Sequence, residues 1–117
     1  MKIPVYNSIE DYLDDEVAYE KETVSEVGDE SNLFWLKMYD DSMSPEIGED
    51  EEVLFMQTKK IDGSGKTVLV SVGKKYSVRR IEYSKDSLWL RPVNEAYETE
   101  YYNCSDLVRV KLVAVKL

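Results

Sequence analysis

The stretch TVLVSVGKKYSVRRIEY, residues 67–83, decides the fold class. Three valines occupy alternate positions in its first part, which is the two-residue period of a β-strand with one buried face. Gly73 and the two lysines after it can turn the chain, because glycine adopts the backbone conformations that tight turns need. Alternation then resumes, so we predict an antiparallel hairpin with strands at 67–72 and 76–83.

Further strand patterns lie on both sides of this hairpin. Apolar side chains alternate with larger or charged ones at 34–38, and a short apolar run follows at 53–56. Downstream, residues 88–91 form a strand pattern that stops at Pro92, and 107–117 is a long aliphatic run. At least five strands separated by turns predict a mostly β fold, a folded sheet or partial barrel of short antiparallel strands with hairpins.

Helical patterns are scarce. Ser8-Ile9-Glu10-Asp11 resembles a capping box, in which a serine and a later acidic residue satisfy the free amides at a helix start. Apolar residues then recur at helical spacing up to Val17. We therefore predict one helix over residues 8–18, and at most one or two short helices in the chain.

The composition bounds the fold and the possible chemistry. A length of 117 residues fits one domain, 1–117. No apolar run approaches the roughly 20 residues of a membrane helix, and the N-terminus lacks a signal-peptide pattern, so we expect a cytoplasmic protein that contacts no membrane. One cysteine, Cys104, excludes an internal disulfide. The absence of histidine argues against a zinc site and against a Ser-His pair, and we expect no metal or cofactor.

The charge is unevenly spread along the chain. Residues 1–52 hold 17 acidic and 3 basic residues, whereas residues 53–117 hold 7 acidic and 12 basic ones, for a net charge of −9. Phosphate neutralisation supplies most of the affinity for nucleic acid, so we expect this domain not to bind DNA or RNA directly. The acidic half is interpreted as a solvated surface, and a basic protein partner is the alternative.

One segment carries a candidate nucleophile. Ser42 is followed by Met43, Ser44 and Pro45, a pattern typical of a turn or helix start whose free backbone amides can stabilise an oxyanion. A serine at such a place is also a common helix cap, so Ser42 alone does not establish catalysis. Without histidine, only a lysine or a carboxylate could remove its proton.

The segment DSMSPEIGEDEEVLF, residues 41–55, resembles the Asp-Ser-Met-x-Pro segment of the LexA family, which includes phage CI-type repressors and UmuD. Further landmarks of that family follow in order at 67–72, 78–81 and 90–97, and an Ile-Pro-Val landmark precedes them at 3–5. The resemblance therefore covers nearly the whole chain. It implies an autoprotease fold in which a serine attacks the protein's own linker and a neutral lysine on a neighbouring strand removes the hydroxyl proton.

The resemblance places Ser42 at the nucleophile position and makes the backbone amide of Met43 a candidate for the oxyanion site. The family's lysine lies in a Val-Lys-Arg segment, and this chain reads Val78-Arg79-Arg80 there, so Arg79 occupies the position of the base. Burial can lower the pKa of a lysine far enough to leave it neutral near pH 7. A guanidinium keeps its proton and has no acceptor atom, so the resemblance predicts that the general base is missing.

Two neighbouring lysines are poor substitutes for that base. Lys75 shares strand parity with Arg79, but four residues along a strand span about 13 Å, beyond hydrogen-bond reach of one fixed serine. Lys74 falls on the opposite parity or in the turn. We interpret both lysines as the charged tip of the hairpin.

The resemblance also locates the cleavage site. Active relatives carry a small Ala-Gly or Cys-Gly pair after the Ile-Pro-Val landmark, and counting from Pro4 places Asp11-Tyr12 at that position. A carboxylate and a bulky phenol fit badly into a pocket shaped for small residues. Both the base and the substrate segment thus depart from the family pattern.

We therefore expect a non-cleaving oligomerisation and regulatory domain of a phage-type or bacterial transcriptional repressor. Its helix-turn-helix DNA-binding domain would precede residue 1, and a regulatory protein partner is a further expectation. The aliphatic run 107–117 predicts a homodimer if it lies at a sheet edge. Two alternatives stay open: an active LexA-like serine peptidase that uses Ser42 with another base, and a stand-alone acidic adaptor.

Overall fold

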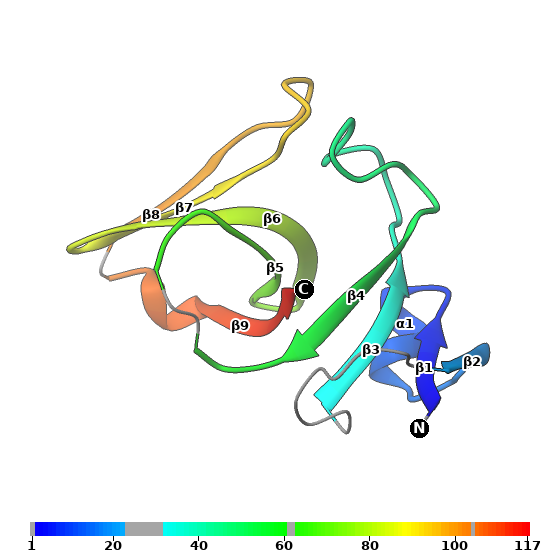
Figure 1. Ribbon diagram of the computed structural model, residues 1–117. Helices are drawn as coiled ribbons and strands as arrows, with labels where there is room; N and C mark the ends of the chain where they lie inside the picture. The colour runs from blue at the N-terminus through cyan, green and yellow to red at the C-terminus, as the bar shows by residue number, and fades with distance from the viewer. Residues whose placement is uncertain (1, 23–31, 61–62, 104) are drawn as a thin grey trace.

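The computed structural model describes residues 2–22, 32–60, 63–103 and 105–117 (Figure 1). In these residues nine strands form one mixed sheet, in the order β2-β1-β3-β4-β9-β5-β6-β7-β8. The prediction of a mostly β fold is confirmed. The strands are β1 (Lys2–Tyr6), β2 (Tyr19–Glu22), β3 (Leu33–Lys37), β4 (Glu52–Gln57), β5 (Lys66–Val72), β6 (Lys75–Ser84), β7 (Ser87–Arg91), β8 (Glu100–Asn103) and β9 (Val110–Lys116).

The predicted hairpin is β5 and β6, which pair antiparallel from Lys66 with Ile81 to Val72 with Lys75. Gly73 adopts a φ of 62°, the left-handed conformation that glycine tolerates best and that the turn requires. Both faces of the hairpin are buried, because Leu69 joins one hydrophobic cluster and Val68 joins another. The two clusters explain why nearly every residue of β5 is buried.

Figure 1 shows how the sheet is bent. β5, β6 and β9 curl around one another on one side, whereas β1, β2, β3 and helix α1 (Ile9–Leu13) lie on the other, with β4 between them. The hairpin of β7 and β8 projects away from the curled part. All neighbouring strands are antiparallel except β1 and β3, which pair in parallel through Val5 with Trp35 and Tyr6 with Leu36.

The predicted helix over residues 8–18 is too long. Ser8 caps α1 as expected, since its Oγ accepts a 3.0 Å hydrogen bond from the Asp11 amide, but the helix ends at Leu13. Asp15 has a φ of 54°, a left-handed conformation that commonly ends helices. The chain then returns along β1 as β2, so pairing with β1 outweighs the helical spacing of the apolar residues.

The predicted strand over 107–117 is too long, and the edge position on which the homodimer expectation depended is not found. Residues Leu107–Arg109 form a 3-10 turn, and β9 begins at Val110. β9 then lies inside the sheet, paired with β4 on one side and β5 on the other. Ala114 and Val115 pair on both sides, whereas Val110, Lys111 and Leu112 pair with β5 alone, so β9 does not form an end strand of the sheet. The end strands of the sheet are β2 and β8.

The described residues contain neither a membrane-spanning helix nor a cluster of metal ligands. No helix in these parts of the chain is long and apolar enough to cross a membrane. Nor do the described residues contain a group of three or more Cys, Asp or Glu side chains that could hold a metal ion. Cys104 lies outside the described residues.

Candidate functional site

The candidate nucleophile lies in a tight turn after β3. The amide of Ser44 donates to the carbonyl of Asp41, and the amide of Ile47 donates to the carbonyl of Met43. The side chains of Met43 and Ile47 are fully buried in the hydrophobic cluster that includes residues of β3 and β4 and against which α1 packs. These two apolar anchors fix the turn against the core, so Ser42, which directly precedes Met43, is held in one place.

The structure brings Ser42 and Arg79 into direct contact. Arg79 lies on β6 opposite Val68, and its Nη1 donates a 2.8 Å hydrogen bond to Ser42 Oγ. Ser42 is 0% exposed and Arg79 is 7% exposed, so water has little access to this contact. The resemblance predicted that these two positions belong to one site, and they do lie together, while their chemical roles stay predictions.

The guanidinium of Arg79 is held by three groups. Besides Ser42, its Nη1 donates to the carbonyl of Val78 at 2.7 Å, and its carbon Cζ lies 5.8 Å from the ring centroid of Tyr97. Its Nε is buried and has no hydrogen-bond partner among the described residues. Every polar atom of a guanidinium is a donor, so Arg79 can hold the serine hydroxyl or stabilise negative charge but cannot accept a proton.

A carboxylate that the sequence reasoning missed accepts the serine proton. Ser42 Oγ donates to Asp40 Oδ1 at 2.6 Å, and the Ser42 amide donates to the same oxygen at 3.0 Å. An aspartate two residues before an amide often accepts from it in this way, so the pattern Asp-x-Ser was the available signal. The hydroxyl therefore lies between an acceptor, Asp40, and a donor, Arg79.

A second segment, Val93 and Asn94 after β7, forms hydrogen bonds with the serine turn. The amides of Val93 and Asn94 both donate to the carbonyl of Ser42, at 3.1 and 2.9 Å. The side-chain amide of Asn94 also donates to the carbonyl of Asp41 at 3.1 Å. These three bonds explain why a Val-Asn pair after β7 belongs to the same site as the serine.

Tyr97 also contacts the serine turn, and residues 93–97 together form a covering segment over it. Its hydroxyl donates to Asp41 Oδ1 at 2.7 Å, and its ring lies over the Arg79 guanidinium. The hydrogen bond to Asp41 raises the pKa of Tyr97 to about 12, with burial and the charges of Asp40, Asp41 and Glu49 acting in the same direction. The phenol is therefore neutral near pH 7 and remains a donor to Asp41.

The backbone amide of Met43, the candidate oxyanion donor, donates to no acceptor among the described residues. It is therefore free to bind an oxygen atom, as an oxyanion site requires. Its role as an oxyanion donor stays a prediction.

The two lysines of the hairpin tip lie elsewhere. Lys74 and Lys75 line a cavity with residues of α1 and with Tyr39 and Tyr76. Neither contacts Ser42 Oγ, whose side-chain partners in the described residues are Asp40 and Arg79. Among the described residues, neither of these two lysines is placed to accept the proton of Ser42.

The degenerate cleavage position, Asp11-Tyr12, lies within α1. The Tyr12 ring stacks on Phe34 with centroids 4.3 Å apart, and its hydroxyl accepts a 2.8 Å hydrogen bond from Gln57 Nε2. The peptide bond between the two residues is thus part of a capped helix packed on the core. That this position corresponds to the family's cleavage site stays a prediction.

The comparisons with known proteins agree with these landmarks. A search of curated proteins found no match to the chain. The family model described as Peptidase S24-like matches residues 2–114, which spans β1 to β9 and includes Ser42, Arg79 and the covering segment at Asn94. The chain therefore belongs to the Peptidase S24-like family, the family of LexA and CI-type domains.

Proposed function

We propose that this domain is a non-cleaving oligomerisation and regulatory module of a phage-type or bacterial transcriptional repressor. The observation that carries the proposal is the contact between Arg79 Nη1 and Ser42 Oγ. In a serine-lysine pair the corresponding nitrogen must present a lone pair to the hydroxyl. Here the nitrogen presents a hydrogen, and the hydroxyl proton is directed to Asp40 instead.

Two further observations support loss of cleavage. Ser42 is 0% exposed, so a peptide carbonyl cannot reach its Oγ unless the covering segment around Asn94 moves. The Asp11–Tyr12 bond lies inside α1, and the Tyr12 ring is stacked on Phe34. The nucleophile, the base and the substrate segment therefore each lack a feature that the reaction needs.

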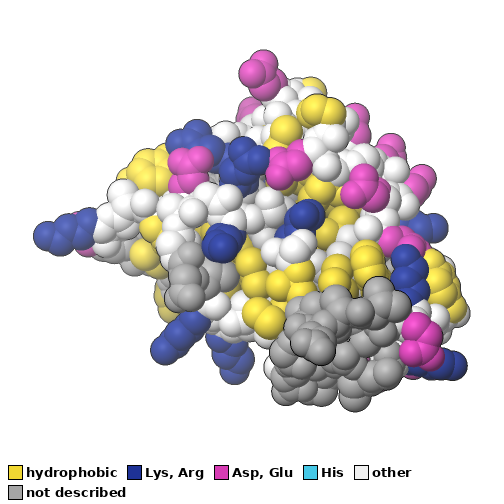
Figure 2. Space-filling model, in the orientation of Figure 1, with side chains coloured by type: hydrophobic (Ala, Val, Ile, Leu, Met, Phe, Trp, Pro, Cys, Tyr) yellow, Lys and Arg dark blue, Asp and Glu magenta, His cyan; other side chains and the backbone are white. Residues whose placement is uncertain are grey.

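The charge distribution supports a domain that acts together with a separate DNA-binding domain and does not itself bind DNA. Figure 2 shows Asp and Glu side chains spread over much of the visible face, with Lys and Arg gathered mainly toward the side of the curled strands. With a net charge of −9 the domain is a weak ligand for DNA phosphates. A helix-turn-helix domain joined to its N-terminal side would supply DNA binding, and dimerisation would raise affinity through effective concentration.

A homodimer is part of this proposal, with a different edge from the one that the sequence suggested. β9 is internal, whereas β8 ends the sheet and carries Tyr101, which is 54% exposed. Free strand edges with few charges favour pairing with another chain. We place the dimer contact at β8.

A second candidate function has one observation in its favour. Asp40 Oδ1 lies 2.6 Å from Ser42 Oγ, within the range for proton transfer, and Arg79 could stabilise the alkoxide that results. The chain would then be a self-cleaving peptidase with a carboxylate base. A carboxylate is a far weaker base than a neutral amine, so we rank this function second.

The test is self-cleavage of the purified domain carrying the protein sequence that precedes it. The sample is incubated near neutral pH and at about pH 10, where a serine-lysine peptidase gains its neutral base, and followed by intact mass. We expect one unchanged mass at both values. Two fragments that disappear in Ser42→Ala would contradict the proposal, and their loss in Asp40→Asn as well would establish the carboxylate mechanism.

A further inference from the structure

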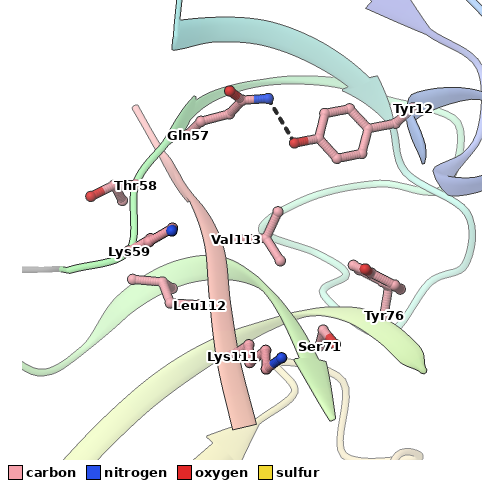
Figure 3. Close-up of a pocket in the computed structure, with 9 residues that line it drawn as sticks. All are labelled: Tyr12, Gln57, Thr58, Lys59, Ser71, Tyr76, Lys111, Leu112 and Val113. Atoms are coloured by element: carbon pink, nitrogen blue, oxygen red, sulfur yellow. Dashed lines mark hydrogen bonds between the residues drawn. The ribbon is translucent and has the colours of Figure 1, made fainter. Parts of the chain in front are cut away.

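A second cavity of about 470 Å³ lies away from Ser42, between α1, the end of β4, β9 and the turn end of the β5–β6 hairpin (Figure 3). Its size falls within the roughly 300–1,000 Å³ of pockets that bind small molecules. Tyr12 and Tyr76 lie on one side of β9 in this view, and Lys59 lies on the other. The cavity is independent of the site proposed above, because neither Ser42 nor Arg79 lines it.

The charged side chains that line the cavity are two lysines, Lys59 and Lys111, with no acidic residue among its described lining residues. This is unusual in a chain with 24 acidic and 15 basic residues. Three basic side chains elsewhere, Lys21, Arg80 and Arg91, form ion pairs with carboxylates, the last with Glu82 at 2.9 Å. Neither Lys59 nor Lys111 forms an ion pair with another described residue. The cavity therefore has a positive charge that the described part of the protein does not neutralise.

Two phenols that line the same cavity supply neutral donors. The hydroxyl of Tyr12 accepts from Gln57 Nε2, so its own proton remains available for an acceptor in the cavity. Burial raises the pKa of Tyr12 above its ordinary value of 10.0, the bond from Gln57 lowers it, and the nearby Tyr76 raises it. Tyr76 forms no hydrogen bond through its hydroxyl among the described residues. Both phenols also offer aromatic faces to an apolar group.

A bulge in β9 shapes the wall between the lysines and the phenols. Leu69 pairs with Ala114 and Val70 pairs with Leu112, so Val113 has no partner in β5. Its carbonyl accepts instead from the Thr58 amide at 3.1 Å. Bulges redirect side chains and occur often beside binding sites. Figure 3 shows the Val113 side chain directed to the side of the two tyrosines, where it adds apolar surface.

From this arrangement we infer that the cavity binds a small organic carboxylate with an aromatic or aliphatic body. The carboxylate would contact Lys59 and Lys111, and the body would lie against Tyr12, Tyr76 and Val113. Because Tyr12 belongs to α1 and Tyr76 to β6, three residues before Arg79, the ligand would connect the helix to the strand of the serine site. A small effector bound in the cavity would therefore contact both α1 and β6.

The test uses 3-phenylpropionate as the probe and its neutral amide, 3-phenylpropanamide, as the matched control ligand, titrated into the isotopically labelled protein and followed by amide chemical shifts. We expect saturable shifts at the lining residues with the acid, and binding of the amide weaker by about tenfold, because a charge-assisted contact is lost.

The test variant combines Lys59→Gln and Lys111→Gln. The control variant combines Lys66→Gln and Lys85→Gln, which removes the same charge from exposed positions outside the cavity. The first pair should weaken binding of the acid by about tenfold or more while the control pair leaves it unchanged. Absence of saturable shifts with the acid, equal binding of acid and amide, or equal loss in both pairs of variants would overturn the inference. None of these outcomes bears on whether Ser42 cleaves.

Discussion

Arg79 Nη1 donates a 2.8 Å hydrogen bond to Ser42 Oγ, in a contact where the serine is fully buried. The direction of this bond excludes Arg79 as a base for Ser42, because a base would have to accept from the serine and a guanidinium can only donate. Asp40 takes the proton of the same hydroxyl at 2.6 Å. The three side chains form a continuous set of bonds from β6 to the end of β3, so the site also links two parts of the sheet.

The serine should therefore be a structural residue whose loss is measurable. In Ser42→Ala, Arg79 loses one acceptor and Asp40 loses one donor, and we expect the free energy of unfolding to fall by about 1–3 kcal/mol. Urea unfolding followed by circular dichroism measures the change. The control is Ser44→Ala in the same turn, where no side-chain hydrogen bond is lost among the described residues, and where the change should stay within about 0.5 kcal/mol. Equal effects would show that the bonds of Ser42 add no stability.

Two replacements of Arg79 distinguish what its charge contributes to stability from what its volume contributes. Arg79→Ala leaves a cavity and removes the donors to Ser42 and Val78, so we expect a loss of about 2–4 kcal/mol in unfolding free energy. Arg79→Met fills most of the space and relieves the buried Nε of its missing partner, so its cost should be within about 1 kcal/mol. If Met costs as much as Ala, the charge and its hydrogen bonds outweigh packing.

The strands that the sequence predicted are those with a regular apolar pattern. β5 and β6 alternate clearly, and their turn carries Gly73. β2 reads YEKE and has almost no apolar residue. It pairs with β1 because the chain reverses after Asp15, and its side chains are mostly exposed. No local pattern reveals such a strand, and none reveals that β9 lies between two neighbours, since pairing order depends on the whole sheet.

Only part of the site was predicted, because its local motifs are visible in the sequence and its tertiary contacts are not. The motif around Ser42 and the Val-Arg-Arg segment identified the two positions that meet, and the resemblance supplied their adjacency. Asp40 was missed because it lies outside the quoted motif, although its spacing from Ser42 is typical of a side chain that accepts from an amide two residues later. The cover by Asn94 and Tyr97 depends on tertiary contacts 53 and 56 residues apart, which spacing alone does not predict.

Restoring a lysine should not restore cleavage on its own. Arg79→Lys introduces an amine that burial can render partly neutral, so it supplies the base that the family uses. The Asp11–Tyr12 bond would still lie within α1, with the Tyr12 ring packed on Phe34, and Ser42 would still be covered. We expect intact protein after prolonged incubation at about pH 10, measured by mass spectrometry. Fragments that depend on Ser42 would show that the missing base is the single obstacle.

Stability should fall at high pH through buried phenols. Burial, reinforced by the hydrogen bond to Asp15 and its charge, raises the pKa of Tyr6 from 10.0 to about 12. Below pH 10 both the folded and the unfolded protein keep this proton, so the stabilisation is fully present there. Above pH 10 the unfolded chain releases the proton first, and the stabilisation is lost as the pH rises toward 12. Urea unfolding between about pH 9 and 11 should show this decline, and Tyr6→Phe should make it shallower. Identical slopes would contradict the assignment.

The position of β8 predicts how the domain self-associates. β8 ends the sheet, and Tyr101 on it is 54% exposed, whereas Tyr19 on the opposite end strand β2 is 47% exposed and donates its hydroxyl hydrogen to Glu52. A lysine on a strand edge opposes pairing with another chain because its charge would have to lose water. We expect sedimentation equilibrium to show a dimer whose dissociation constant rises by about tenfold or more in Tyr101→Lys and little in Tyr19→Lys. A dimer weakened by Tyr19→Lys alone would move the contact to β2. A monomer at all accessible concentrations would remove dimerisation from the proposed function and leave regulation through a partner protein as its remaining basis.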